Sequence, residues 1–151
     1  MSILEAAENQ VRSILLSQPE VEQLVVDSPP GAGKTGVVER LAIQGAWIHR
    51  ERIMIATQTN GQSFDLALRL ASGWPDRPLF LFTRKGLPLP SRIVDQSNIT
   101  QVDSLDHLPS GPLVVVGNSA KWSYSGWEGG EPPFDLMLVD EAYQLRDSQF
   151  A

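Results

Sequence analysis

The strongest constraint on the fold is an eight-residue stretch, SPPGAGKT, which occupies residues 28–35 and is called the phosphate loop below. It fits the pattern G-x-x-x-x-G-K-[ST] at every position except the first, where Ser28 replaces glycine. A short apolar strand over residues 23–26 precedes the loop, and a helix is expected to begin at Lys34. Strand, loop and helix in this order predict a nucleoside-triphosphate site and disfavour a plain Gly-rich turn with an incidental lysine.

Each part of the phosphate loop has a physical role. Gly31 and Gly33 can adopt backbone conformations that turn successive N–H groups toward an anion. The N-terminus of the following helix adds about half a positive charge. Lys34 can reach the β- and γ-phosphates, and the Thr35 hydroxyl can ligate the Mg²⁺ that bridges them. The expected nucleotide-binding residues are Pro30, Gly31, Ala32, Gly33, Lys34, Thr35 and Gly36.

Composition indicates a soluble protein. The 151 residues suit about one domain, and 42% apolar with 20% charged residues is ordinary for a globular chain. The absence of cysteine excludes disulfides and thiolate metal sites, and two distant histidines argue against zinc. The N-terminus lacks the positive charge of a secretory signal, and no apolar run approaches the roughly eighteen residues that span a bilayer. We therefore expect a cytoplasmic protein with no membrane partner.

Net charge bears on the class of partner. The value of −6, with a pI near 4.8, argues mildly against nucleic acid, because nucleic-acid binders usually carry a basic face. Basic residues can nevertheless be local, as in Arg84–Lys85 or in Lys121 beside Trp122. Contacts with nucleic acid would then have to be focused in a groove.

Apolar runs and helical periodicity divide the chain into alternating elements. Residues 2–17 repeat apolar side chains at helical spacing, with Ser2 as the expected cap. Further helices are expected over residues 34–48 and 61–72, and strands over residues 23–26, 52–57, 79–83, 98–102, 113–116 and 134–140. Loops or turns are expected over residues 84–96, 117–121 and 123–133. Short apolar strands alternating with helices predict an α/β fold: a mostly parallel sheet with helices on both faces.

A second acidic element follows the last apolar strand. In LMLVDEAYQ, residues 136–144, Asp140 and Glu141 come directly after four apolar residues. Ligands bind at the carboxyl ends of strands in open α/β sheets. We therefore expect Asp140 to hold Mg²⁺, directly or through water, and Glu141 to orient and deprotonate the attacking water. The alternative, an exposed acidic pair that starts a helix, is disfavoured by the presence of the phosphate loop.

Together these motifs resemble superfamily 1 helicases, in the branch related to the nonsense-mediated-decay helicase. DEAYQ looks like the DEAxQ form of motif II, and SPPGAGKT is similar to GPPGTGKT. IMIATQTNGQSFDLALRL resembles motif Ia, and VVVGNSAKW resembles the segment in which the next strand ends in VVxGT-like residues. The resemblance covers nearly the whole chain in the family order, and it implies a RecA-like P-loop NTPase.

The resemblance also implies roles for single residues. Glu8-Asn9-Gln10 sits where the family carries its Q motif, so Gln10 would read adenine, unless it is a solvated helix residue. Gln144, which ends DEAYQ, would contact the nucleotide. A single strand of DNA or RNA would meet the turn after the second strand, unless this is a plain turn with an Asn cap. The residues implied in that contact are Thr57, Thr59, Asn60 and Asn118. At the position of Asn118 the family more often has Thr.

Three aromatic residues, Trp122, Tyr124 and Trp127, lie within a stretch of six residues, in a loop rich in Ser and Gly. Exposed aromatics there would stack on bases, at about 1–3 kcal/mol each. The alternative, favoured for Trp122, is packing under the edge of the sheet. Both interpretations stay open for Trp127.

Nothing in the chain corresponds to the later motifs of the family: no GDxxQ sensor, no arginine fingers and no second RecA-like domain. We therefore expect residues 1–151 to be the incomplete N-terminal part of a RecA-like ATPase domain. Its parts would be a helix with the Q motif over residues 1–18 and the P-loop core through motif II over residues 22–151. The remainder of the same polypeptide would supply the second domain, and the 151 residues alone would not turn ATP over.

Three functions fit these features. The favoured one is the ATP-binding part of an ATP-dependent nucleic-acid helicase or translocase, with ATP and Mg²⁺ as cofactors and Lys34, Asp140 and Glu141 as catalytic residues. The runner-up is a P-loop ATPase that does not act on nucleic acid, such as a conformational switch or a defence-associated ATPase. A small-molecule kinase is disfavoured, because such kinases rarely pair the phosphate loop with a late Asp-Glu after a buried strand.

Overall fold

The computed structural model describes residues 1–18, 24, 31, 33–124 and 133–140. The chain divides into two compact units, residues 1–41 and residues 42–151. The first unit contains helix α1 (Ile3–Ser17) and most of helix α2 (Lys34–Trp47); the second contains the end of α2 and the sheet. The strand expected over residues 23–26 lies outside the described residues, apart from Leu24. Within the described part, no helix has the length and apolar character that crossing a lipid bilayer requires.

Helix α1 confirms the predicted N-terminal helix and its cap. The Ser2 hydroxyl accepts a hydrogen bond from the Glu5 backbone N–H at 3.1 Å, and the Glu5 carboxylate accepts one from the Ser2 backbone N–H at 2.7 Å. Hydrogen bonds with the Ser2 backbone, and then with its hydroxyl, lower the pKa of the Glu5 carboxyl. A lowered pKa means that this cap stabilises α1 above the unfolded pKa of Glu5 and weakens as the pH falls through the folded one.

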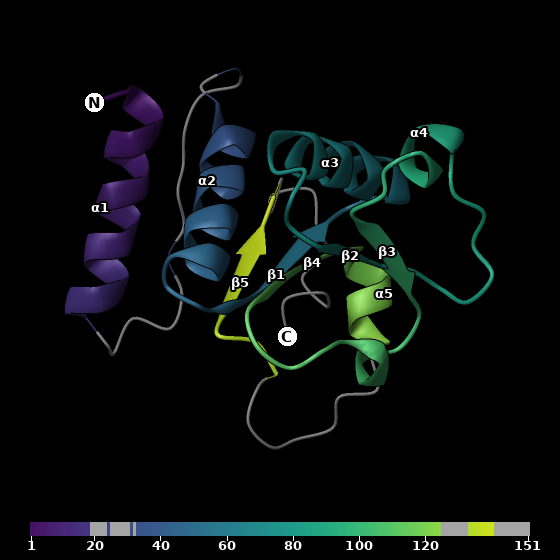
Figure 1. The fold of residues 1–151 in the computed structure, drawn as a ribbon. Coiled ribbons are helices and arrows are strands. Elements are labelled where there is room, and N and C mark those ends of the chain that lie inside the picture. Colours follow the sequence, from purple (N-terminus) through teal and green to yellow (C-terminus); the bar gives the residue numbers. More distant parts are fainter. Residues whose placement is uncertain (19–23, 25–30, 32, 125–132, 141–151) are drawn as a thin grey trace. The chain divides into compact units, whose positions relative to one another are not determined.

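The second unit is built on a five-stranded sheet in which all neighbouring strands are parallel. The order across the sheet is β3-β2-β4-β1-β5 (Figure 1). The strands are β1 (Arg52–Thr57), β2 (Leu79–Phe82), β3 (Ile99–Val102), β4 (Leu113–Asn118) and β5 (Leu136–Val139). This topology confirms the predicted parallel α/β sheet with β3 as an edge strand. Because the strands are parallel, their carboxyl ends meet at one edge of the sheet, called the carboxyl edge below.

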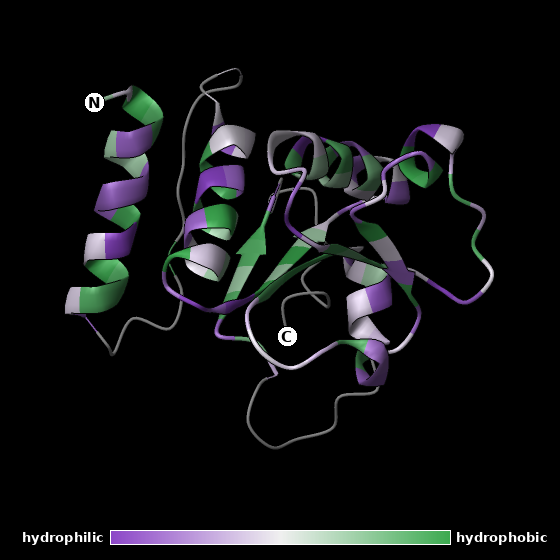
Figure 2. Ribbon diagram, viewed as in Figure 1, coloured by the Kyte–Doolittle hydropathy of each residue, from purple (hydrophilic) through white to green (hydrophobic). Residues whose placement is uncertain are grey.

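Helices cover both faces of this sheet, as the apolar runs predict. Helix α3 (Asn60–Gly73) and helix α5 (Ser119–Ser123) lie on opposite faces (Figure 1). Every residue of β2 is buried, and so are the first five of β4. Figure 2 shows that the interior strands of the sheet are made mostly of hydrophobic residues. Two-sided burial is what distinguishes these continuous apolar runs from the alternating pattern of a half-exposed strand.

Two segments expected to be irregular contain short helices. Helix α4 (Ser91–Val94) lies within residues 84–96, and Pro90 is its N-cap, with an extended backbone and no side-chain hydrogen bond to the helix. The turn expected over residues 117–121 is wrong in its bounds, because β4 continues to Asn118 and α5 begins at Ser119. Helices of four and five residues are too short to leave a periodic signal in the sequence.

Arg52 forms hydrogen bonds at the opposite edge of the sheet, where the strands begin, called the amino-terminal edge below. Its guanidinium donates to the backbone carbonyls of Pro133 at 2.9 Å, and of Pro109 and Gly111 at 2.8 Å each. Its backbone N–H donates to the Asp135 carboxylate at 2.7 Å. One side chain therefore joins the segments that precede β4 and β5, and it closes this edge with internal hydrogen bonds.

Trp122 packs under the sheet, which confirms the interpretation favoured for it. Its ring lies 4.6 Å from the Phe82 ring and 5.5 Å from the Phe134 ring, between ring centroids. Its indole N–H donates to the Ile55 carbonyl at 3.2 Å. This arrangement brings the indole against Gly117, where a Cβ atom would lie 3.0 Å from both the Trp122 Nε1 and the Phe82 carbonyl oxygen.

We expect Gly117→Ala to destabilise the protein by about 1–3 kcal/mol, because the Phe82 backbone cannot yield without breaking the sheet and overpacked cores lose stability on this scale. Urea unfolding would show the loss as a lower midpoint with an unchanged slope. The matched control is Gly73→Ala at the end of α3, where a Cβ would meet nothing within 4 Å. Equal midpoints for the two variants would contradict the assigned packing.

Candidate functional site

The two described glycines of the phosphate loop have the backbone conformation that its sequence predicts. Gly31 has a φ of +79° and Gly33 a φ of +85°, which lie in the left-handed region that favours glycine. A Cβ at Gly31 would meet nothing within 4 Å, so glycine is required there by conformation and not by space. Helix α2 then begins at Lys34, which confirms the predicted start. Pro30 and Ala32 lie outside the described residues.

The start of α2 suits a phosphate group. The first backbone hydrogen bond of the helix runs from the Val37 N–H to the Gly33 carbonyl at 3.2 Å. A helix offers the N–H groups of its first turn no acceptor of its own, and they point toward the position where an anion binds. The first turn contains Lys34 and Thr35 and no acidic residue. A cation and the positive end of the helix dipole therefore favour an anion here, and the Thr35 hydroxyl is next in sequence to the cation.

Helix α1 holds the start of α2 within the first unit. A Cβ on Gly36 would lie 3.1 Å from the Leu4 Cδ1, and one on Gly33 would lie 3.3 Å from the Leu4 Cδ2. The buried Glu8 carboxylate accepts a hydrogen bond from the Arg40 Nε at 2.9 Å. Leu4 and Glu8 were not predicted to support the site. An acidic residue amid an apolar helical pattern was the signal for Glu8, and nothing in the sequence singled out Leu4.

Gln10, the residue expected to read adenine, lies on the exposed part of α1. It follows Leu4 by six residues, or about 9 Å along the helix at 1.5 Å per residue. No residue in the described part of the chain forms a hydrogen bond with its side chain. Its amide is therefore accessible to a ligand, and the adenine contact stays a prediction.

We expect Gln10→Ala to weaken ATP binding more than GTP binding, because adenine alone offers the N6 donor and N7 acceptor that match an amide. Titration of both nucleotides by calorimetry measures the difference. The matched control is Asn9→Ala, which removes a neighbouring exposed amide from the same helix. Equal losses of affinity for the two nucleotides would show that Gln10 does not contact the base and is a solvated residue of α1.

Asp140 lies at the carboxyl edge, as its position after an apolar strand predicts. Its backbone N–H donates to the Ala56 carbonyl at 3.1 Å, which extends the pairing of β5 with β1 by one residue. Asp140, a half-buried residue, therefore lies next to the end of β1. Glu141 and Gln144 lie outside the described residues. The phosphate-loop residues belong to the first unit and Asp140 to the second.

The turn between β1 and α3 is held by its own side chains. Thr57 is 2% exposed, and its hydroxyl donates to the Thr59 carbonyl at 3.0 Å and lies 2.6 Å from the Ser63 hydroxyl. Thr59, not Asn60, caps α3, with Gln62 completing the capping box. Thr57 therefore shapes the turn from inside, and the accessible hydroxyl is that of Thr59.

Asn60 and Asn118 meet at the carboxyl edge although 58 residues separate them. The Asn118 Nδ2 donates to the Asn60 Oδ1 at 2.6 Å, and the Asn118 Oδ1 accepts from the Lys121 N–H at 2.7 Å. The pair ties the end of β4 to the start of α3 and leaves the Asn60 amide nitrogen as a donor. Sequence patterns missed this pairing, because it depends on β1 and β4 being neighbours.

Viewed along the carboxyl edge, the predicted residues of the second unit occupy three adjacent strands. Asp140 follows β5, the Thr57–Asn60 turn follows β1, and Asn118 ends β4. An acidic residue and residues with amide and hydroxyl groups are therefore neighbours on one edge. Comparisons of the chain with protein-family models, with curated protein sequences and with solved structures find no match.

Proposed function

We propose that this chain is the ATP-binding part of an ATP-dependent nucleic-acid helicase or translocase, which hydrolyses ATP with Mg²⁺ in the full-length protein. The observation that supports it most is the left-handed backbone of Gly31 and Gly33 directly before a helix that begins with Lys34 and Thr35. Glycines in that conformation at a helix start are the requirement of a phosphate cradle.

In this proposal each residue has one role. Lys34 binds the β- and γ-phosphate oxygens, and Thr35 and Asp140 hold the metal. When bound, Mg²⁺ neutralises the charge that develops on the phosphates. Glu141, next in sequence to the metal-binding Asp140, orients the attacking water and accepts its proton. Gln10 and Gln144 recognise the nucleotide, and a second RecA-like domain of the same polypeptide completes the motor.

The case for nucleic acid depends on the carboxyl edge. Thr59 and Asn60 offer a hydroxyl and an amide of the kind that contact phosphates and sugars. Their stretch of chain is also the one that resembles motif Ia. Net charge of −6 favours the second candidate, a P-loop ATPase that does not act on nucleic acid.

The two candidates differ in how ATP turnover responds to a polymer. We expect single-stranded DNA or RNA to stimulate the ATPase rate of the full-length protein, and Asn60→Ala to reduce the stimulation while the rate without polymer persists. The control Gln96→Ala removes an amide shortly before the amino-terminal end of β3. If neither DNA nor RNA changes the ATPase rate of the unaltered protein, the helicase assignment is overturned and the second candidate is selected.

A further inference from the structure

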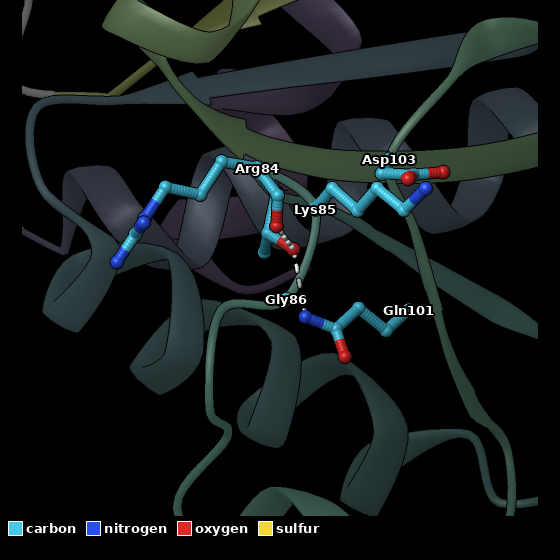
Figure 3. A pocket seen from close by; sticks show the side chains of 6 residues that line it. Arg84, Lys85, Gly86, Gln101 and Asp103 are labelled. Carbon is cyan, nitrogen blue, oxygen red and sulfur yellow. Dashed lines mark hydrogen bonds between the residues drawn. The ribbon is translucent and has the colours of Figure 1, made fainter.

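A polar pocket of about 180 Å³ lies on the carboxyl edge, beyond the strands that carry the predicted residues. It is formed where β2 and β3 end, and its lining residues are Thr83, Arg84, Lys85, Gly86, Gln101 and Asp103 (Figure 3). In the sheet order, β2 is two strands from β1. At about 4.8 Å per strand, the pocket therefore lies about 10 Å from the Thr57–Asn60 turn along the same edge.

Hydrogen bonds hold the floor of this pocket in place. Thr83 is 2% exposed, and its hydroxyl accepts from the Gln101 amide at 2.8 Å and donates to the Arg84 carbonyl at 3.2 Å. The same Gln101 nitrogen donates to the Leu87 carbonyl at 2.9 Å. Gly86, with a φ of +74°, closes a turn in which the Leu87 N–H donates to the Arg84 carbonyl. The loop after β2 is therefore fixed to β3, and its side chains project from a defined base.

The pocket lining carries two cations, Arg84 and Lys85, against one carboxylate, Asp103. Arg84 and Lys85 are exposed, and among the described residues neither side chain forms an ion pair. By contrast, Arg40 pairs with Glu8 and Arg92 with Asp65. The chain has a net charge of −6, so an excess of cations over carboxylates in this lining gives it a local charge of opposite sign. Figure 2 shows this segment as hydrophilic directly after the apolar β2.

The shape of the pocket distinguishes an extended polyanion from a compact anion. Figure 3 shows the Arg84 and Lys85 side chains leaving the loop in opposite directions, so they do not converge on one point. Asp103 adds a carboxylate to the same lining, and its oxygen lies 3.1 Å from the His107 Nδ1. A single small anion would gain one cation and be repelled by Asp103, whereas an extended backbone can place separate phosphates beside each cation.

We propose that this pocket binds the sugar–phosphate backbone of single-stranded nucleic acid, with Arg84 and Lys85 each contacting a phosphate. The inference rests on the proposed function, because it extends the same strand along the carboxyl edge from the Thr59–Asn60 contact, over β4, to β2. The two contacts carry no base specificity, since phosphates are the same in every sequence.

The test measures how salt affects strand binding by the full-length protein. Fluorescence anisotropy of a labelled oligo-dT or oligo-U strand is followed at several salt concentrations for the unaltered protein and for the Arg84→Gln/Lys85→Gln variant. Each phosphate contact on a single strand contributes about 0.7 to the slope of log affinity against log salt. The double variant is expected to lower the slope by about 1.4 and the affinity at low salt at least tenfold.

A control variant separates position from net charge. Arg50→Gln/Arg77→Gln removes the same two charges before β1 and before β2, at the amino-terminal edge of the sheet. Its slope is expected to match that of the unaltered protein. An equal decrease in both variants would show a general charge effect and overturn the pocket assignment.

Asp103→Asn gives a second test with the opposite sign. Removing the carboxylate from the lining is expected to tighten strand binding several-fold, whereas damage to a merely structural residue would weaken it. Inorganic phosphate, added at matched ionic strength, is expected to displace the strand no better than chloride does. Specific displacement by phosphate would indicate a compact anion site and overturn the assignment to a strand.

The outcomes also separate this inference from the proposed function. If the unaltered protein binds the strand and Arg84→Gln/Lys85→Gln binds it equally well, the pocket is not on the path of the strand and the helicase proposal stands. If the unaltered protein binds no strand at all, the proposed function fails, and the pocket assignment fails with it.

Discussion

In the full-length protein, Glu141→Gln is expected to lower ATP turnover by about a hundredfold to ten-thousandfold, the range that general-base catalysis contributes. The amide keeps the size and shape of the carboxylate but cannot accept the proton of the attacking water. ATP binding should therefore persist, because the phosphate loop and Asp140 are unchanged. Steady-state hydrolysis and calorimetric ATP binding, measured on the same preparation, test the two halves of this expectation.

The control for this prediction is Glu51→Gln, the same chemical change directly before β1, at the amino-terminal edge of the sheet. It should leave turnover within a few-fold of the unaltered protein. If Glu141→Gln kept its turnover, another group would have to activate the water. If it lost ATP binding as well, Glu141 would act on the bound nucleotide and not on the water.

Sequence patterns predicted the elements of this fold well, because each strand in the core is a continuous apolar run. β2 and β4 are examples: LFLF and LVVVG are buried on both faces, as expected for short apolar runs in a parallel sheet that helices cover. The two short helices were missed, since α4 and α5 span only about one turn each and their starts depend on caps at Pro90 and Asn118. Short elements of this kind are specified by tertiary packing more than by periodicity.

The candidate site was predictable where chemistry depends on neighbours in sequence. Gly31 and Gly33 needed a left-handed backbone to form a phosphate loop, and they have it. The pair of Asn60 with Asn118 was not predictable, because it requires the strand order that joins β1 to β4. For Thr57, only part of the structural role could be predicted from the sequence. Its place in the turn was predicted correctly, but its burial follows from the Ser63 contact across the first turn of α3.

Lys34→Ala is expected to reduce the affinity for ATP–Mg²⁺ at least tenfold. Hydrogen bonds to charged groups contribute about 1.5–3 kcal/mol, and 1.4 kcal/mol corresponds to a factor of ten. The contribution is at the upper end when the pair is shielded from water, as at a helix start that also presents backbone N–H groups to the same phosphate. Isothermal titration with ATP and with a non-hydrolysable analogue measures the loss free of turnover.

The variant Arg50→Ala removes one positive charge from the segment before β1 and serves as the control for net charge. It should bind ATP as the unaltered protein does, since a solvated charge outside the site is screened within about 10 Å at ordinary salt. Unchanged affinity in Lys34→Ala would mean that the loop is not the phosphate cradle. A loss of ATP affinity in Lys34→Ala without such a loss in Glu141→Gln would separate phosphate binding from water activation, the two roles proposed for these residues.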